Sequence, residues 1–167
     1  LFTDCYYPQI NGVVTSVMLL REELIKQGHE VTVVTVKVPG FTKDEEGVIR
    51  INSIPFARWK EFRVAMPFIF SVYLKIRHLN FDIIHTHTEF TVGLMGRFFS
   101  MHMQIPMVHT YHTIYEDYTH YIASIKTVQS LVKKIIVKGS REYVKPATAV
   151  IVPSEKTKKL MLKYNVR

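Results

Sequence analysis

The stretch that decides the fold is E-V-T-V-V-T-V-K-V at residues 30–38. Its many β-branched residues predict a buried β-strand. Residues 13–27, just before it, carry apolar side chains at helical spacing, and Gly28 follows as a predicted C-cap. Residues 1–4 resemble the end of another buried strand. Together these segments predict a β-loop-α-β unit, which is a right-handed crossover in a parallel sheet.

A polar turn region is predicted at residues 39–47, and after it strands alternate with helices almost throughout. Further strands are predicted at residues 48–54, 81–86, 106–110 and 147–152, and further helices at residues 68–79, 91–103, 125–144 and, after a Ser154 cap, to Lys163. Residues 55–67 are predicted to be irregular. Such alternation favours a doubly wound, mainly parallel sheet, so we expect a single Rossmann-like α/β domain over residues 1–167.

The composition is that of a folded domain, with 47% hydrophobic and 22% charged residues in a chain of 167. The single cysteine, Cys5, excludes an intramolecular disulfide and fits a reducing compartment. No apolar run reaches the roughly 18 residues of a membrane span. The chain lacks an initiator Met and opens within a strand pattern, so we expect a fragment of a longer protein.

Positive charge is concentrated at the C-terminal end of the chain. Residues 126–167 hold 11 of the 22 Lys and Arg residues but 2 of the 14 acidic residues, whereas residues 1–125 are nearly neutral. A basic face of this kind suits an anionic lipid surface, a nucleic acid or an acidic partner domain.

Three unusual loops follow predicted strands, at residues 4–12, 85–90 and 108–121. Ligands of open parallel sheets bind beyond the carboxyl ends of the strands, so the loops together predict one site. The first loop ends in Asn11, Gly12 and Val13 at a predicted helix N-terminus, where free N–H groups and the helix dipole attract phosphate. The alternative is that Asn11-Gly12 is a tight turn and nothing more.

Four of the histidines in the second and third loops raise the question of a metal site. The pairs His85-x-His87 and His109-x-x-His112 have spacings that zinc accepts, but no cysteine joins them and H-E-x-x-H is absent. We therefore expect no metal and interpret the histidines as neutral donors of hydrogen bonds to a polar ligand. His85 and His109 are predicted to be satisfied within the sheet, and His87 and His112 to face the ligand.

The acidic pair Glu116 and Asp117 has two interpretations. Either carboxylate is suited to act as a general base or to bind hydroxyl groups. Both are equally suited to the first turn of a helix, where acidic side chains are stabilised by the helix dipole. Neither a Ser-His-Asp elbow nor a kinase motif occurs in the sequence.

Two basic amphipathic stretches suit a membrane surface. Their apolar and basic residues include Phe68, Phe70, Lys75 and Arg77 in the first stretch and Lys133 and Lys134 in the second. Such helices bury an apolar face at the headgroup level, and each Lys or Arg near anionic lipid is worth about 1 kcal/mol. The alternative is an apolar stripe that faces the core and a basic face that is solvated.

Four motifs occur in an order and at a spacing that resemble a known family. They are T-D-C-Y-Y-P-Q-I-N-G-V-V-T-S from residue 3, D-I-I-H-T-H-T-E-F-T-V-G from residue 82, M-V-H-T-Y-H-T-I-Y-E-D-Y-T-H-Y-I from residue 107 and A-V-I-V-P-S-E-K from residue 149. Together they resemble the N-terminal domain of retaining group 1 glycosyltransferases with the GT-B fold. Within that family the chain resembles the bacterial diacylglycerol glucosyltransferases over essentially its whole length.

The resemblance implies an enzyme of two Rossmann-like domains with the active site between them. The N-terminal half, present here, would shape the acceptor site and touch an anionic membrane, while an absent C-terminal half would grip the nucleotide sugar through an E-x7-E motif. The implied reaction moves glucose from UDP-glucose to diacylglycerol with retention of configuration and without a metal or other cofactor. We expect residues 1–167 alone to be inactive.

The resemblance also implies roles for individual residues. The loop Asn11-Gly12-Val13 would contact the donor diphosphate, and His112, which follows an aromatic residue, would act at the donor sugar as the catalytic histidine. The residues implied to bind the acceptor are His87, Tyr111, Tyr115 and Asp117. The implied location is cytoplasmic, peripheral on the inner face of the cell membrane.

The residues leave two alternatives open. One keeps the enzyme class but has a soluble sugar or a cell-wall precursor as acceptor, with the basic helices facing the absent domain. The other is a non-enzymatic basic module, for example for nucleic acid. We rank it last and expect no nucleic-acid partner, because the aromatic residues are not interleaved with basic ones as a stacking platform requires.

Overall fold

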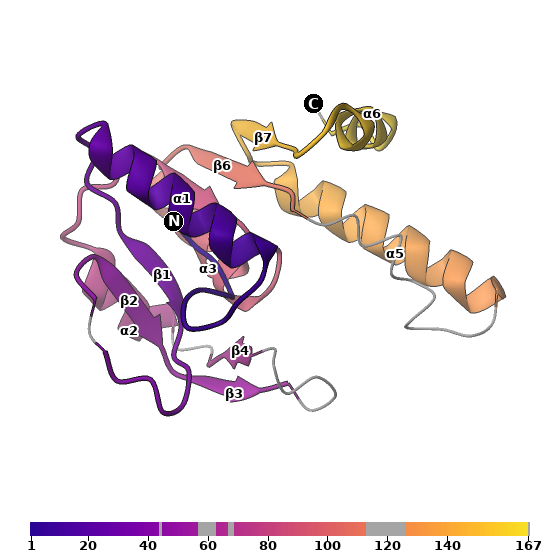
Figure 1. The fold of residues 1–167 in the computed structure, drawn as a ribbon. Coiled ribbons are helices and arrows are strands. Elements are labelled where there is room, and N and C mark those ends of the chain that lie inside the picture. The colour runs from indigo at the N-terminus through magenta and orange to yellow at the C-terminus, as the bar shows by residue number, and fades with distance from the viewer. Residues whose placement is uncertain (44, 57–62, 67–68, 113–125, 167) are drawn as a thin grey trace.

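The computed structural model describes residues 1–43, 45–56, 63–66, 69–112 and 126–166, with the backbone alone for residues 126–133 (Figure 1). The elements along the chain are α1 (Gly12–Lys26), β1 (Val33–Val36), β2 (Val48–Ile51), β3 (Ser53–Pro55), β4 (Arg63–Ala65), α2 (Ile69–Ile76), β5 (Ile84–Thr86), α3 (Thr91–Met103), β6 (Met107–Thr110), α5 (Lys126–Val144), β7 (Ala149–Ile151) and α6 (Glu155–Lys163). Strands and helices alternate along most of the chain, except that β1, β2, β3 and β4 follow one another without a helix between them.

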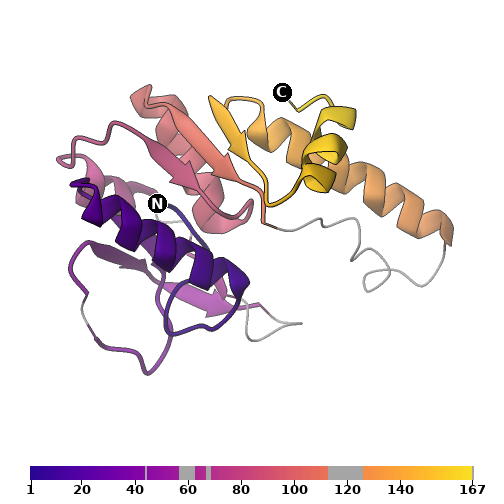
Figure 2. The same ribbon diagram turned by 45° about the horizontal axis from the view of Figure 1, so that its top comes forward.

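A parallel sheet runs through the molecule (Figure 2). β1 pairs with β2 in one half, and β5, β6 and β7 pair in that order in the other. Phe2 joins the halves, because it forms parallel bridges to both Val34 and Thr86. With the Phe2 segment counted as the first strand, and β3 and β4 set aside, the spatial order is 3-2-1-4-5-6. This is the order of the doubly wound Rossmann fold.

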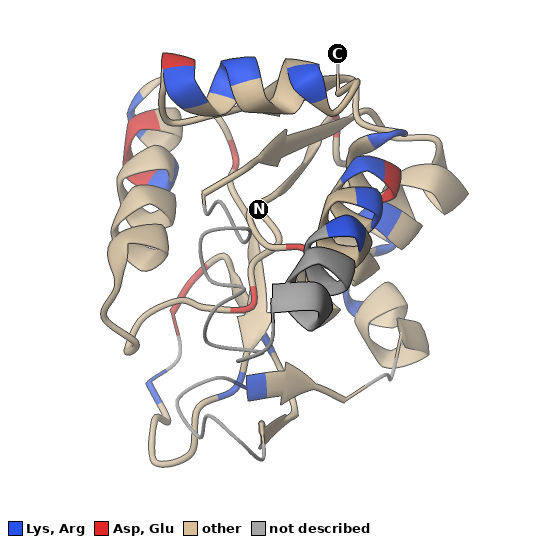
Figure 3. Ribbon diagram, turned by 90° about the vertical axis from the view of Figure 1, so that its right-hand side faces the viewer, with Lys and Arg blue, Asp and Glu red and all other residues tan. Residues whose placement is uncertain are grey.

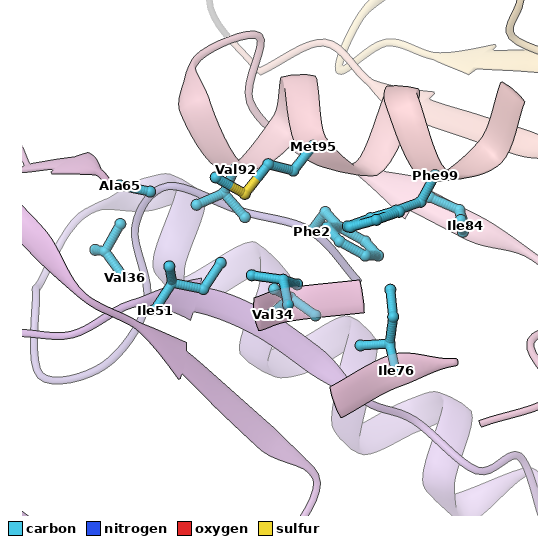
Figure 4. Close-up of a cluster of buried hydrophobic side chains, with 11 residues drawn as sticks. Phe2, Val34, Val36, Ile51, Ala65, Ile76, Ile84, Val92, Met95 and Phe99 are labelled. Atoms are coloured by element: carbon cyan, nitrogen blue, oxygen red, sulfur yellow. The ribbon is translucent and has the colours of Figure 1, made fainter. Parts of the chain in front are cut away.

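Helices cover both faces of this sheet. On one face α1 packs through Val17 against Val33. On the other face α2 and α3 enclose the larger core, whose side chains include Phe2, Val34, Ile76, Ile84, Met95 and Phe99 (Figure 4). Full burial of an apolar side chain of this size stabilises a fold by about 1.5–3 kcal/mol. The arrangement confirms the prediction of a doubly wound, mainly parallel α/β domain.

The C-terminal part of the chain adds an apolar cluster of its own. Tyr143 and Val144, at the end of α5, pack with Met161 of α6 and with Tyr111, which follows β6. The first half of α5 extends beyond the sheet (Figures 1 and 2). No described helix is both long and apolar enough to cross a bilayer.

Two predicted helix ends are confirmed by their capping geometry. Gly28 has a left-handed conformation, with φ of +88°, just after the C-cap of α1. At the start of α6, Ser154 Oγ accepts a hydrogen bond from the Thr157 N–H at 3.2 Å.

The predicted single strand at residues 48–54 is wrong. It divides at Asn52, so that β2 runs parallel to β1 whereas β3 pairs antiparallel with β4. β4 falls within residues 55–67, which were predicted to be irregular. Alternation with a period of two marks an extended chain but does not identify the sheet that the chain joins. Arg63 stabilises the β3–β4 pairing, since its guanidinium donates to Ser53 Oγ at 2.7 Å and to Ser53 O at 2.8 Å.

Candidate active site

The Phe2 segment and β5 are neighbours in the sheet, and the loops that follow them lead to helices on opposite faces, α1 and α3. Such a topological switch point is where open α/β sheets bind their ligands. The two loops are tied together, since the Asp4 N–H donates to Thr88 Oγ1 at 3.0 Å and that hydroxyl donates to the Asp4 carboxylate at 2.5 Å. This edge of the sheet therefore carries the candidate site.

A buried carboxylate occupies the N-terminus of α3. Asp4 is 8% exposed and accepts hydrogen bonds from the N–H groups of Val92 at 2.9 Å and Gly93 at 3.3 Å. The Thr91 hydroxyl donates to the same carboxylate at 2.5 Å. Amides at a helix start have no partner within the helix, and the dipole favours negative charge there. The anion-binding end of α3 is thus filled by the protein itself.

Gly93 makes this close packing possible. A Cβ atom at position 93 would lie 1.7 Å from the Thr88 carbonyl oxygen and 2.9 Å from the Tyr143 hydroxyl. The Tyr143 hydroxyl in turn donates to the Thr88 carbonyl at 3.1 Å. The first turn of α3 therefore rests directly on the loop after β5, without space for a ligand between them.

The N-terminus of α1, in contrast, is open. Asn11 Oδ1 caps the helix by accepting from the Val14 N–H at 2.9 Å. Within the described part of the chain, nothing accepts from the N–H groups of Gly12 and Val13, and a Cβ atom at Gly12 would meet no atom within 4 Å. Two amides of the predicted Asn11-Gly12-Val13 loop are thus available to an anion.

Two of the four histidines are satisfied inside the sheet, as predicted. His109 is fully buried, and its ring nitrogens lie 2.9 Å from Thr86 Oγ1 and 3.4 Å from a Glu89 carboxylate oxygen. His85 Nε2 lies 2.7 Å from Thr110 Oγ1. Both rings have neighbours that hold them in place within the sheet.

The other two histidines meet at the carboxyl edge. His87 follows β5, His112 follows the neighbouring strand β6, and His87 Nδ1 lies 3.1 Å from His112 Nε2. The His87 side chain is 3% exposed, and its Nε2 atom is buried without a hydrogen-bond partner among the described residues. His112 is half-buried. The structure thus places His112 nearer to the surface of the rim and His87 behind it.

Burial keeps these rings neutral. Burial first, and then neighbouring groups that include the other histidines, lower the pKa of His85 to about 4 and the pKa of His87 well below its ordinary value of 6.5. The pKa of His112 is also lowered, first by burial and then by His109. Near neutral pH the three imidazoles are therefore uncharged, each with one N–H and one lone pair.

The remaining predicted acceptor residues are placed as follows. Tyr111 is 3% exposed and packs in the C-terminal apolar cluster, with its hydroxyl 3.5 Å from Ser140 Oγ. Tyr115 and Asp117, like Glu116, lie outside the described residues.

Sequence reasoning missed the role of Asp4 and its partners on the next strand. The only signal was an acidic residue directly after a buried strand, and nothing local connects it with Thr88, 84 residues later. The partner is identified by the strand order, which places the two carboxyl ends side by side.

The predicted membrane residues on α2 lie at its exposed side. Phe70 is 70% exposed, and Lys75 and Arg77 are exposed, whereas Val72 and Ile76 on the opposite side belong to the core. Phe68 lies outside the described residues. α2 therefore has apolar side chains on its buried side and a large apolar side chain, Phe70, on its exposed side.

A basic groove separates α5 from α6. It is lined by Lys134, Lys138 and Arg141 of α5 and by Lys163 of α6, with Glu142 as its acidic member. Figure 3 shows Lys and Arg residues along both helices. The side chain of Lys133 is not described.

In the described ranges, no cluster of three or more His, Cys, Asp and Glu side chains has the arrangement of a metal site.

The fold and this edge define the class of the protein. Residues 10–167 match Glycosyltransferase Family 4, and the chain belongs to that family. It is 42% identical over its whole length to an alpha-monoglucosyldiacylglycerol synthase of Streptococcus pneumoniae, and 39% identical over 99% of its length to an alpha-monoglucosyldiacylglycerol synthase of Acholeplasma laidlawii. It covers 37% and 43% of those proteins.

A more distant similarity concerns a different donor. The chain is 28% identical, over 68% of its length, to a GDP-mannose-dependent alpha-mannosyltransferase of Corynebacterium glutamicum, and it covers 28% of that protein.

Proposed function

We propose that this chain is the acceptor-side half of a retaining glucosyltransferase that moves glucose from UDP-glucose to diacylglycerol. The observation that carries the proposal is the 42% and 39% identity, across the entire chain, to two alpha-monoglucosyldiacylglycerol synthases. The sheet order supports it, since the three loops predicted to form the site follow three adjacent strands.

In this proposal the open N-terminus of α1 binds the donor diphosphate. The amides of Gly12 and Val13 have no acceptor in the described part of the chain, and a helix start favours negative charge. The neighbouring helix start, at α3, already holds the Asp4 carboxylate. The diphosphate of a nucleotide sugar therefore has one free helix end at the switch point and one that is filled.

His112 acts at the donor sugar in the same proposal. It is half-buried at the rim and neutral, so it offers one hydrogen bond without the cost of burying a charge. We propose that Tyr115 and Asp117 bind the acceptor, and that His87 and Tyr111, which are both buried, support the acceptor site. The acceptor hydroxyl attacks the anomeric carbon, UDP leaves, and neither a metal nor a cofactor takes part.

A second domain completes the enzyme in this proposal. The chain spans about two fifths of the length of the synthases that it matches. We propose that the remaining part grips the nucleotide and that residues 1–167 alone transfer no sugar.

The experiment uses the full-length enzyme with UDP-glucose or GDP-mannose as donor and with diacylglycerol micelles or soluble sugars as acceptor. We expect glucosyldiacylglycerol with an α-anomeric proton in its NMR spectrum. Mannolipid formation would point to the donor named in the more distant relative. Transfer to soluble sugars alone, or a β-linked product, would overturn the proposed acceptor or the proposed retention.

We further propose that the basic helices hold the protein on the inner face of the cell membrane. Phe70 is 70% exposed on the helix that also carries Lys75, and four cations line the groove between α5 and α6. Each such cation near anionic lipid contributes about 1 kcal/mol. Replacement of Lys75, Arg77, Lys133 and Lys134 by Glu should abolish sedimentation with anionic vesicles. Equal binding of wild type and variant, or equal binding to neutral vesicles, would contradict this.

A further inference from the structure

Three histidine rings form a row at the carboxyl edge of the sheet. The ring centres of His85 and His87 are 4.2 Å apart at an interplanar angle of 26°, and those of His87 and His112 are 5.4 Å apart at 28°. The first ring is held by Thr110, whose hydroxyl lies 2.7 Å from His85 Nε2. The middle ring, His87, is therefore confined between two imidazoles and is almost completely buried.

A hydrogen bond between His87 Nδ1 and His112 Nε2 requires that one of these nitrogens carries a proton and the other does not. Two arrangements are therefore possible. In the first arrangement His87 Nδ1–H donates to His112 Nε2, which leaves a bare lone pair at the buried Nε2 of His87. In the second, His112 Nε2–H donates to His87 Nδ1, which leaves a buried N–H at His87 Nε2. In the described part of the chain, the His87 Nε2 atom has no hydrogen-bond partner.

The two arrangements differ in cost. A buried N–H without an acceptor is rarer in proteins than an under-used acceptor, so the first arrangement is favoured. It consumes the Nε2 lone pair of His112 and places the proton of that ring on Nδ1. Lowered pKa values at both rings agree with a neutral pair that shares a single bridging proton.

We propose that His87 is a positioning residue that holds His112 as the Nδ1–H tautomer, so that His112 donates a hydrogen bond rather than accepting a proton. That this bond goes to the donor sugar rests on the proposed function. His112 Nε2 is then unavailable as a general base for the acceptor hydroxyl. A residue that hydrogen-bonds to one ring nitrogen of a functional histidine fixes both the tautomer and the orientation of that ring.

The first test reads the tautomer directly and needs no turnover. Full-length protein labelled with ¹⁵N-histidine is studied by two-bond ¹H–¹⁵N correlation NMR near pH 7.5, and His112→Gln assigns the signals. We expect a protonated Nδ1 and a bare Nε2 at His112. A protonated Nε2 at His112 in the wild type would overturn the proposal.

The second test separates positioning from packing. His87→Leu removes the bond to His112, whereas His87→Asn places an amide near the position of Nδ1. We expect kcat of His87→Leu to fall by about 10- to 100-fold, as for a displaced catalytic group, with KM for the donor unchanged. His87→Asn should recover most of that loss, and His29→Leu, at an exposed site after α1, should have wild-type kinetics.

Each outcome of the second test either supports or contradicts the positioning role of His87. Unchanged kcat in a folded His87→Leu protein, or an equal loss in both His87 variants, would overturn the positioning role. If His87→Leu does not fold, His87→Asn and the wild-type NMR spectrum still test the proposal. A wild-type enzyme that has the Nδ1–H tautomer but makes no glucolipid would sink the proposed function alone.

Discussion

At the carboxyl edge of the sheet, α1 and α3 both begin soon after a strand, and both begin near a glycine. The amides that start α3 are bonded to the Asp4 carboxylate, whereas the Gly12 and Val13 amides of α1 have no acceptor in the described residues. The glycines differ in the same way. A side chain at Gly93 would strike the Thr88 backbone, but one at Gly12 would meet nothing.

The difference between the filled N-terminus of α3 and the open N-terminus of α1 indicates which helix N-termini are free to bind a ligand. Both helices have a dipole that is positive at the N-terminus, and in both the first N–H groups lack an acceptor within the helix. In α3 an internal anion uses that potential to stabilise the fold and to join two loops. In α1 the potential is left for an external anion. Four substitutions test this contrast, and they are taken in order of their expected effect on the free energy of unfolding.

The largest effect is expected for Gly93→Ala. Its Cβ atom would lie 1.7 Å from a backbone oxygen, so the first turn of α3 must move away from the loop after β5. Overpacking against backbone should cost about 3 kcal/mol, measured by urea unfolding with far-UV circular dichroism. The matched control is Gly139→Ala on α5, where a Cβ atom has open space. Equal stability of the two variants would contradict the close packing.

A smaller loss is expected for Asp4→Asn. The amide keeps the shape of the carboxylate but removes its charge and presents an N–H₂ group to donors such as the N–H groups of Val92 and Gly93. Lost charge-assisted hydrogen bonds should lower the free energy of unfolding by about 2 kcal/mol. A variant as stable as the wild type would show that the N-terminus of α3 is not filled by Asp4.

At α1, Asn11→Ala should cost about 1 kcal/mol, the usual value for a lost N-cap. The side chain accepts one bond, from the Val14 N–H, so the loss is smaller than at Asp4. Asn11→Ser keeps a capping oxygen and should recover most of the stability in the same unfolding assay. A loss as large as that of Asp4→Asn would mean that the two helix ends are equally integral to the fold.

The smallest effect on stability, and the sharpest contrast, is expected for Gly12→Ala. No described atom lies within 4 Å of the new methyl group, so the free energy of unfolding should stay constant or rise by less than about 1 kcal/mol. In the full-length enzyme the methyl group should obstruct the diphosphate and raise the donor KM about tenfold, which is about 1.4 kcal/mol. An unchanged KM would remove α1 as the diphosphate site.

Much of the fold was predictable because its signals are local. Periodicity marked α1, α3 and α6 with their ends, and the β-branched run at residues 30–38 contains β1. The alternation that suggested one strand over residues 48–54 failed, because the same pattern serves a strand of the parallel sheet and a strand of a separate antiparallel pair.

The site was predictable in part. The sequence located three loops after three strands and separated His85 and His109 from His87 and His112, and the structure shows the first pair satisfied inside the sheet. It did not predict that His87 lies behind His112 with a nitrogen that has no partner in the described residues, because burial at a strand end depends on the neighbouring strands.

The sequence by itself determined the class of fold, the family and the loops in which chemistry gathers, because periodicity, capping residues and motif spacing are properties of short segments. Tertiary structure alone decided which helix end is filled and which is open, and which imidazole supports the other. Those choices depend on contacts such as Asp4 with Thr88 and His87 with His112, 84 and 25 residues apart. They exist only because the strand order brings these carboxyl ends together at one edge.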